Sequence, residues 1–411
     1  MASTAFGPKN TCAGFPEPLV CISAKTHTFW KGIDMESHIS RRQFGKLAAA
    51  GALGSGTLLS CSAETPSPAT VSAPVQSDLE KKWGIEPGIK MHIGHIRPDN
   101  TDEEIMFVKQ LGVEYTEFYI PHQVSFYDDL VALKNRMANL GLKIFVVGYD
   151  AGNHWYNFTD RIILGQDGRD EDIKNYQRFL ADAGRAGMHT VCYGFYNRSG
   201  QRTGNITDRG ASVTQFDLTK FAPGLSNDRE YAEEELWDNY AYAMKQILPA
   251  AEDAGVRLSL HPNDPPITLR GVPQIFRNNK TFERMIQITN NSPCAGIEFC
   301  VGTWATMASA DGGPEDVIGA IKQFGSKIFT VHFRNATGTV PLFNETHIDT
   351  GRLDMHEVLS TLKAVGFNGS MEPDHVPAFA DEKRFTNKSV VGTAYAIAYT
   401  RALLDRVNAE G

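Results

Sequence analysis

Four segments of the sequence each end an apolar run on a side chain that can bind a metal ion or move a proton. In the first, residues 257–260 alternate like a short strand, and His261 precedes Pro-Asn-Asp-Pro-Pro, which cannot continue a sheet ladder. His261 is therefore expected where a strand ends and a rigid loop begins. Three later segments repeat this arrangement, at 296–300, 328–332 and 369–375.

The spacing of the terminal residues predicts that they meet. His261, Cys300, His332 and Asp374 are separated by about one βα unit each, so the strands of a barrel would bring them to one rim. Two imidazoles, a thiolate and a carboxylate form a divalent-metal shell, in which the oxygen and nitrogen donors suit Mn or Fe and the thiolate also admits Zn. Each residue taken alone has a plainer interpretation, such as a small buried cysteine. Their repetition in successive units favours the metal site.

Residues next to these ligands are candidates for substrate chemistry. His375 adjoins Asp374 and faces a different direction, so it is expected to act as acid or base. Arg334, two residues after His332, can hold a substrate carboxylate with its planar fork, or form an ion pair on the barrel rim.

Further polar residues near the strand ends are weaker candidates. Glu298 is either a fifth metal ligand or, as we favour, part of an ion pair in the barrel interior. Glu345 and His347 lie in a later loop and are candidates for substrate contact, although polar loop residues need no special explanation. His92 and His95 can line the pocket but have no partner by spacing.

The elements that must position these residues alternate in type along the chain. Eight βα units in residues 88–411 predict an α/β fold, a (β/α)8 TIM barrel, with its active site at the carboxyl ends of the strands. An open doubly wound sheet is the alternative, but the segment after the first strand, Gly-His-Ile-Arg-Pro-Asp, is not the Gly-rich phosphate turn that it favours. The expected strands are 90–96, 115–121, 143–149, 189–196, 257–261, 296–302, 327–334 and 370–375. The expected helices are 101–111, 125–140, 170–186, 228–254, 273–289, 314–324, 354–365 and 389–407.

Two long connections interrupt this alternation. Residues 197–227 contain Arg202 and Asp208 and lack clear periodicity, and residues 335–351 form a second such stretch. Loops of this length in a compact domain are usually functional, often as lids.

The composition excludes several classes of protein. The chain has 411 residues, of which 42% are hydrophobic and 21% charged, as in ordinary globular proteins. Its formal charge of -8 and the absence of a long basic run argue against nucleic-acid binding. The six cysteines form no CxxC pair, which argues against a disulfide framework or a zinc ribbon. A homo-oligomer is compatible with the sequence.

The N-terminal residues 1–61 resemble an export signal, with Met35 as an alternative start. The paired Arg41 and Arg42 precede a short apolar run at 47–59, and the order of these features resembles a twin-arginine signal. The following Leu-Leu-Ser-Cys resembles a lipobox ending at Cys61, which predicts a lipid-anchored protein on the periplasmic side whose membrane contact is this anchor alone. A buried helix after a chance arginine pair is the alternative. Residues 62–87, which begin with a Ser, Pro, Ala and Thr-rich stretch, are expected to be a flexible tether.

The strand-end motifs resemble those of the mannonate dehydratase family, and the resemblance covers most of residues 88–400. The resembling pieces occur in family order: 261–266 (His-Pro-Asn-Asp-Pro-Pro), 299–302 (Phe-Cys-Val-Gly), 331–334 (Val-His-Phe-Arg), 353–355 (Leu-Asp-Met) and 373–375 (Pro-Asp-His), together with 170–176 and 237–260.

This resemblance implies a TIM barrel that dehydrates D-mannonate to 2-keto-3-deoxygluconate, usually with Mn(II) and with Fe(II) as an alternative. It implies a metal shell of His261, Cys300, His332 and Asp374, and His375 as the catalytic histidine. The metal would bind the carboxylate of the sugar acid and stabilise the charge that forms when the α-proton leaves.

Two features depart from the family pattern. Members have a catalytic tyrosine in a Gly-Tyr context after the Asp-His pair, whereas residues 376–391 contain no tyrosine and offer Arg384 or Phe385 instead. An export signal is also unusual for sugar-acid catabolism. A sugar isomerase, epimerase or keto-sugar lyase of the same barrel type is therefore one alternative function. A non-catalytic sugar-binding lipoprotein is another, although binding alone would not require His375.

Overall fold

The computed structural model describes residues 78–122, 126–151, 156–197, 201–309, 311–379, 384–385 and 388–410. The predicted export signal, Cys61 and most of the predicted tether lie outside these residues, as do the side chains of Arg384 and Phe385. Within the described part, no helix is both long enough and apolar enough to cross a membrane.

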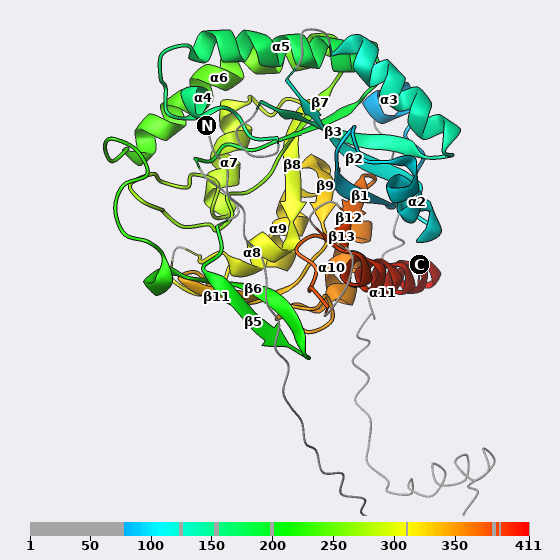
Figure 1. Cartoon of the computed structure of the whole chain (residues 1–411). Coiled ribbons are helices and arrows are strands. Elements are labelled where there is room, and N and C mark those ends of the chain that lie inside the picture. The colour runs from blue at the N-terminus through cyan, green and yellow to red at the C-terminus, as the bar shows by residue number, and fades with distance from the viewer. Residues whose placement is uncertain are drawn as a thin grey trace, which may run out of the picture. The chain divides into compact units, whose positions relative to one another are not determined.

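Eight parallel strands close into a barrel, which confirms the predicted fold class (Figure 1). Neighbouring strands follow the order β1-β12-β9-β8-β7-β4-β3-β2. All eight lie within or close to the segments expected from the sequence. They are β1 (Lys90–Ile96), β2 (Tyr115–Pro121), β3 (Lys143–Asp150), β4 (Thr190–Tyr193), β7 (Arg257–Leu260), β8 (Ala295–Cys300), β9 (Ile328–His332) and β12 (Ser370–Glu372).

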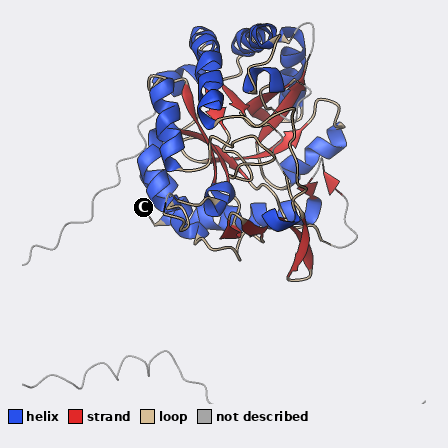
Figure 2. Cartoon of the chain, turned by 90° about the vertical axis from the view of Figure 1, so that its left-hand side faces the viewer, coloured by secondary structure: helices blue, strands red, loops and turns tan. Residues whose placement is uncertain are grey.

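Helices surround the barrel strands (Figure 2). Their apolar residues recur at helical spacing, as in α5, where the buried residues Ile173, Tyr176, Leu180 and Ala183 face the strands. The long helices are α2 (Asp102–Gln110), α3 (Tyr127–Asn139), α5 (Arg169–Arg185), α6 (Glu233–Ala254), α7 (Asn279–Ile288), α9 (Val317–Phe324), α10 (Met355–Ala364) and α11 (Val390–Ala409). The short elements are α4 (Asp160–Ile163), α8 (Val301–Thr306), η2 (Leu218–Lys220), η3 (Gly325–Lys327), β13 (Arg384–Phe385) and β14 (Lys388–Ser389).

Local sequence signals set the ends of several helices. Thr101 caps α2, because its side chain accepts from the backbone of Glu104 while the Glu104 carboxylate accepts from the backbone of Thr101. Gly255 ends α6 at φ 64°, a left-handed conformation that glycine adopts without steric cost. β7 starts two residues later, so the position of His261 is set by the end of this helix and the start of this strand.

The folded part begins before residue 88, so the predicted tether at 62–87 is wrong in its last residues. Asp78–Trp83 forms the helix α1, and the indole Nε1 of Trp83 donates to the carbonyl of Gly255 across 2.7 Å. The guanidinium of Arg257 lies 5.3 Å from the centre of the Trp83 ring. These contacts hold α1 against the start of β7. The Pro- and Ser-rich stretch, whose composition predicted flexibility, ends before this helix begins.

Parts of both long connections, within residues 204–217 and 336–345, form one antiparallel sheet. This accessory sheet has the order β10-β11-β6-β5 and lies below the barrel strands in the view of Figure 1. Phe216 of β6 pairs with Phe343 of β11, and their rings stack with centroids 5.4 Å apart. Its strands are β5 (Gly204–Asp208), β6 (Ala211–Asp217), β10 (Ala336–Thr339) and β11 (Leu342–Glu345).

These strands are hard to recognise in the sequence because they are short and because one of the three strand pairs, β6 with β11, joins distant segments. Gln215 and Asn344, which are hydrogen-bonded across β6 and β11, are separated by 129 residues. Local alternation cannot reveal a partner so far away, and the absence of clear periodicity was therefore misleading.

Candidate metal centre and active site

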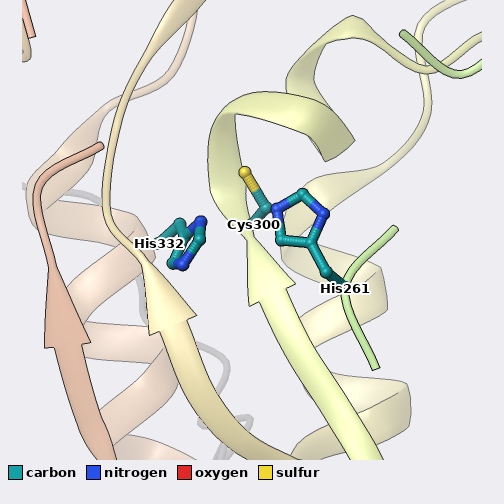
Figure 3. Close-up of side chains that lie close together, drawn as sticks. All are labelled: His261, Cys300 and His332. Atoms are coloured by element: carbon teal, nitrogen blue, oxygen red, sulfur yellow. The ribbon is translucent and has the colours of Figure 1, made fainter. Parts of the chain in front are cut away.

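Three side chains from consecutive barrel strands meet at the carboxyl ends of those strands. His261 follows β7, Cys300 ends β8 and His332 ends β9, and Figure 3 shows the two rings on either side of the thiol. One ligand atom from each residue lies within 4.8 Å of the others, and all three side chains are buried. Parallel strands in a barrel end at one rim, so the regular spacing in the sequence becomes proximity in space.

The hydrogen bonds of the two imidazoles suit metal ligation. Nδ1 of His261 lies 2.6 Å from the carbonyl oxygen of Pro262 and can only donate to it, which leaves Nε2 with a free lone pair. Both ring nitrogens of His332 are buried and form no hydrogen bond with the described residues. A buried polar atom of this kind calls for a water or an ion. The site therefore fits a divalent cation with nitrogen and sulfur ligands.

The environment of Cys300 favours the thiolate. Burial alone would raise its pKa, but the charge of Arg334 and contacts with His261 and His332 lower the pKa to about 5. The hydroxyl of Thr303 donates to Sγ across 3.1 Å. Because the thiolate is the form that binds metals, Cys300 is ready for ligation at neutral pH.

Asp374 lies beside this group, on the side of His332. Its Oδ2 is 3.4 Å from Nδ1 of His332 and accepts from Nε of Arg334 at 3.2 Å. Burial would raise the pKa of Asp374, but the neighbouring His375, His332 and His95 hold it well below the ordinary range. The fourth predicted ligand is therefore an ionised carboxylate in contact with His332, one of the other three.

Arg334 is the centre of a buried ion network. Nη1 donates to Glu345 at 2.6 Å, and Nη2 donates to Asp264 at 2.9 Å and to Thr303 at 3.1 Å. With the bond to Asp374, these contacts leave few donors for a substrate carboxylate. The structure therefore favours the ion-pair interpretation of Arg334 over the expected substrate contact.

A second arginine, Arg202, reaches the same network from the segment before β5. Its Nη2 donates to Asp264 at 2.8 Å and to Glu345 at 2.5 Å, and lies 3.4 Å from Nδ1 of His375. Glu345, at the end of β11, thus joins both arginines, and although burial would raise its pKa, their charges and His375 lower it to about 2. The accessory sheet is connected to the barrel rim through these two residues.

His375 is held between two carboxylates but remains partly accessible. Its Nδ1 is 3.3 Å from Oε1 of Glu345 and its Nε2 is 3.3 Å from Oδ2 of Asp374, while 27% of the side chain is exposed. Its backbone lies at φ 47°, which is strained for a residue with a side chain. This geometry leaves His375 able to reach both the buried ligands and a bound molecule.

His347, the other candidate from the loops, lies in a different environment. Its Nδ1 is 2.9 Å from Oδ2 of Asp208, and its ring packs edge-on against Phe379 and Tyr395. These contacts connect β5 to the segment after β11 and to α11. Among the described residues, no ion pair or hydrogen bond joins His347 to the ligand group.

The sequence interpretation missed most of a polar cluster inside the barrel. Glu117, Glu298 and Glu372 are buried in β2, β8 and β12, together with His92 of β1. Only Glu298 was assigned to the barrel interior in advance, and it lies 3.5 Å from Nε2 of His332. A charged residue in the middle of an apolar parallel strand was the available signal, since such strands are buried on both faces.

The fold and its rim define a class: a (β/α)8-barrel enzyme with a set of metal-ligating side chains at the carboxyl ends of its strands. The model of the D-mannonate dehydratase (UxuA) family matches residues 101–222 and 205–410 of the chain. The chain belongs to the D-mannonate dehydratase family, whose members are metal-dependent hydro-lyases.

Individual relatives agree with this assignment. A mannonate dehydratase from Oceanobacillus iheyensis is 29% identical over 313 residues, which cover 68% of this chain and 85% of the relative. One from Thermotoga maritima is 27% identical, over 72% of this chain and 91% of the relative. The solved structure of mannonate dehydratase from Streptococcus suis serotype 2 superposes with a TM-score of 0.67 at 26% identity, covering 79% of this chain and 96% of that one.

More distant structures share the fold alone. A xylose isomerase domain protein from Planctomyces limnophilus has a TM-score of 0.51 at 14% identity, covering 79% of this chain and 99% of that one.

Proposed function

We propose that the protein removes water from a sugar acid, with D-mannonate as the first substrate to test and 2-keto-3-deoxygluconate as its product. The observation that carries this proposal is the meeting of His261, Cys300 and His332 next to a partly exposed His375. Family membership supports the reaction class.

The ligand set proposed for the metal is His261, Cys300, His332 and Asp374, with Mn(II) as the favoured ion and Fe(II) as the alternative. Three of these residues form one group, and Asp374 contacts His332. A bound divalent ion would supply positive charge for the substrate carboxylate and for the negative charge that develops when the neighbouring proton leaves.

His375 is proposed to move the proton. Dehydration breaks a C–H bond next to the carboxylate and a C–O bond on the next carbon, and the hydroxyl needs a proton to leave as water. Glu345 and Asp374 flank the two ring nitrogens of His375 and orient the ring. The exposed edge of the His375 ring gives it access to a bound molecule. Arg334 and Glu345 bind each other instead, and they act by positioning His375.

The lack of a tyrosine in residues 376–391 keeps an isomerase or epimerase as the second candidate. A dehydratase and an isomerase or epimerase would use the same metal ligands and the same proton abstraction, but only the dehydratase releases water. The product therefore separates them.

The test uses the full chain loaded with Mn(II) and a panel of hexonates, hexuronates and keto-sugars, with products identified by NMR. A 2-keto-3-deoxy acid from D-mannonate supports the proposal, and conversion of a keto-sugar without loss of water would replace it. His375→Ala is expected to retain its metal and lose turnover. His356→Ala is the control, because His356 is a partly exposed histidine paired with Glu410, and this variant should retain both. Unchanged turnover in His375→Ala would overturn the role of His375.

The proposed location is the periplasmic side of a membrane, with a lipid anchor at Cys61. The order of twin arginines, apolar run and lipobox-like Cys61 in the sequence supports it. Arg41→Lys combined with Arg42→Lys is expected to retain the protein in the cytoplasm, and Cys61→Ser to release it from the membrane fraction. Unchanged fractionation of both variants would contradict the proposal.

A further inference from the structure

A second group of potential ligands lies inside the barrel, next to the rim site but formed by other residues. His92 of β1, Glu117 of β2 and Glu372 of β12 place one ligand atom each within 4.8 Å of the others, and all three are buried. Glu117 also belongs to a group with Cys192 of β4 and Glu298 of β8. Glu117 therefore connects side chains from five strands.

Two carboxylate oxygens in this interior cluster accept no hydrogen bond from the described part of the chain, although one of them, Oε2 of Glu117, lies 3.9 Å from Nε2 of His92. Oε2 of Glu117 and Oε2 of Glu298 are buried and form no hydrogen bond with the described residues. The other oxygens accept from Cys192 at 3.1 Å and from Thr330 at 3.2 Å. Both carboxylates are fully buried, so each bare oxygen bears the desolvation cost of a charge unless an ion or a proton compensates it.

The backbone of β1 brings two of these carboxylates together. A Cβ atom at Gly94 would overlap Oε2 of Glu117 and Oε2 of Glu372, so both oxygens converge on this position, and the backbone N–H of Gly94 donates to Glu372. Only glycine leaves room for two carboxylates here. Charge compensation is also scarce, because among the described residues neither Glu117 nor Glu298 forms an ion pair with lysine or arginine.

We propose that this interior cluster binds a second divalent cation, with Glu117, Glu372 and His92 as ligands and Glu298 beside them. Oxygen-rich ligand sets of this kind suit a hard cation such as Mn²⁺ or Mg²⁺. The cation would neutralise the buried negative charge that the histidines alone leave uncompensated.

The second site adjoins the first through two carboxylates. Nε2 of His332 is 3.5 Å from Oε1 of Glu298 and 3.6 Å from Oε1 of Glu372. His95 makes a second link between the two sites, because its Nε2 lies 3.4 Å from Oε1 of Glu372 and 3.5 Å from Oδ1 of Asp374. Carboxylates between two ligand groups can bridge a pair of ions, so the barrel would hold a two-metal centre.

A bound proton is the alternative to a bound cation as the charge that compensates this cluster, and the pKa of Glu117 is consistent with both. Burial, followed by the charges of Glu372 and Glu298, raises that pKa to about 7. A buried carboxyl group next to other carboxylates is stabilised by gaining a proton or by binding a cation. Only metal stoichiometry separates the two.

The test loads the full chain with Mn(II), removes loosely bound metal by gel filtration and measures manganese per chain. We expect about two equivalents in the wild-type protein, and about one in both Glu117→Gln and Cys300→Ser, since each variant loses one site. Asp172→Asn is the matched control, because it removes a buried carboxylate of α5 that pairs with Arg161 of α4, and it should keep both ions. Circular dichroism verifies that each variant is folded.

One equivalent in the wild-type protein, unchanged in Glu117→Gln, would overturn the inference and assign protons to the cluster. If Glu117→Gln fails to fold, anomalous diffraction from Mn(II)-loaded wild-type crystals decides, with two peaks upholding the proposal and a single peak overturning it. The outcome is independent of the proposed reaction. A chain that binds two ions without dehydrating a sugar acid upholds this inference and refutes the function, whereas dehydration with one ion does the reverse.

Discussion

Nε of Arg334 lies 3.2 Å from Oδ2 of Asp374 and joins the end of β9 to the end of β12. The same guanidinium donates to Glu345 and Asp264, which come from the accessory sheet and from the loop after β7. One cation thus orients a predicted metal ligand and holds together three segments that are remote in sequence.

Replacing Arg334 by methionine is expected to lower the free energy of unfolding by about 3–5 kcal/mol, because it leaves buried carboxylates without their main partner. Urea denaturation of the metal-free chain measures this. Arg209→Met is the control, since the ion pair of Arg209 with Asp349 is partly exposed and is worth about 1 kcal/mol or less. Equal effects of the two substitutions would contradict the central position of Arg334.

Arg202 is expected to couple the accessory sheet to the rim. In Arg202→Gln, the bonds to Asp264 and Glu345 are lost, so amide hydrogen exchange in β5 and β6 should accelerate and KM should rise several-fold. Lys220→Gln serves for comparison, because it removes the contacts of an exposed lysine with Asp217 and Gln215 of the same sheet but no contact to the rim. Exchange as slow as in the wild-type protein would show that other contacts hold the sheet.

The thiol of Cys300 should titrate near pH 5 in the metal-free protein. The ultraviolet absorbance of the thiolate, followed against pH, is expected to show a step there that disappears in Cys300→Ser. Burial raises the pKa of Cys294, so Cys294→Ser should keep the step. A step that appears only in the alkaline range would mean that Arg334 and the two histidines do not stabilise the thiolate.

The stability of the metal-free protein should depend on Glu117 in a defined pH range. Its folded-state pKa of about 7 lies above the ordinary value of 4.5, so the folded state favours the protonated form. The stabilising contribution is therefore complete below about pH 4.5 and is lost as the pH rises through 7, by up to about 3 kcal/mol.

Glu117→Gln should remove this part of the pH dependence. The difference between the unfolding free energies of the wild-type and Glu117→Gln proteins isolates this contribution, because the other titrating groups, such as Cys300 with its pKa of about 5, are present in both proteins. Parallel curves for the two proteins between pH 4.5 and 7 would contradict the raised pKa.

Local patterns were sufficient for the barrel. The alternation of short apolar runs with helical segments predicted all eight strands, because this signal depends on residues close in sequence. The accessory sheet was not predicted, because Phe216 and Phe343 come from separate connections that are brought together only by the tertiary fold.

The same distinction between local and distant signals applies to the residues of the site. The regular spacing of His261, Cys300 and His332 along the chain was enough to predict that they end successive strands, and closure of the barrel brings them into contact. Tertiary structure alone decided that Arg334 binds carboxylates from three segments, that Arg202 enters the rim, and that Glu117 and Glu372 converge on Gly94. The physical reason is that ligand spacing repeats with the βα unit, whereas ion pairs and interior contacts depend on which side chains face each other across the barrel, and no period along the chain encodes that.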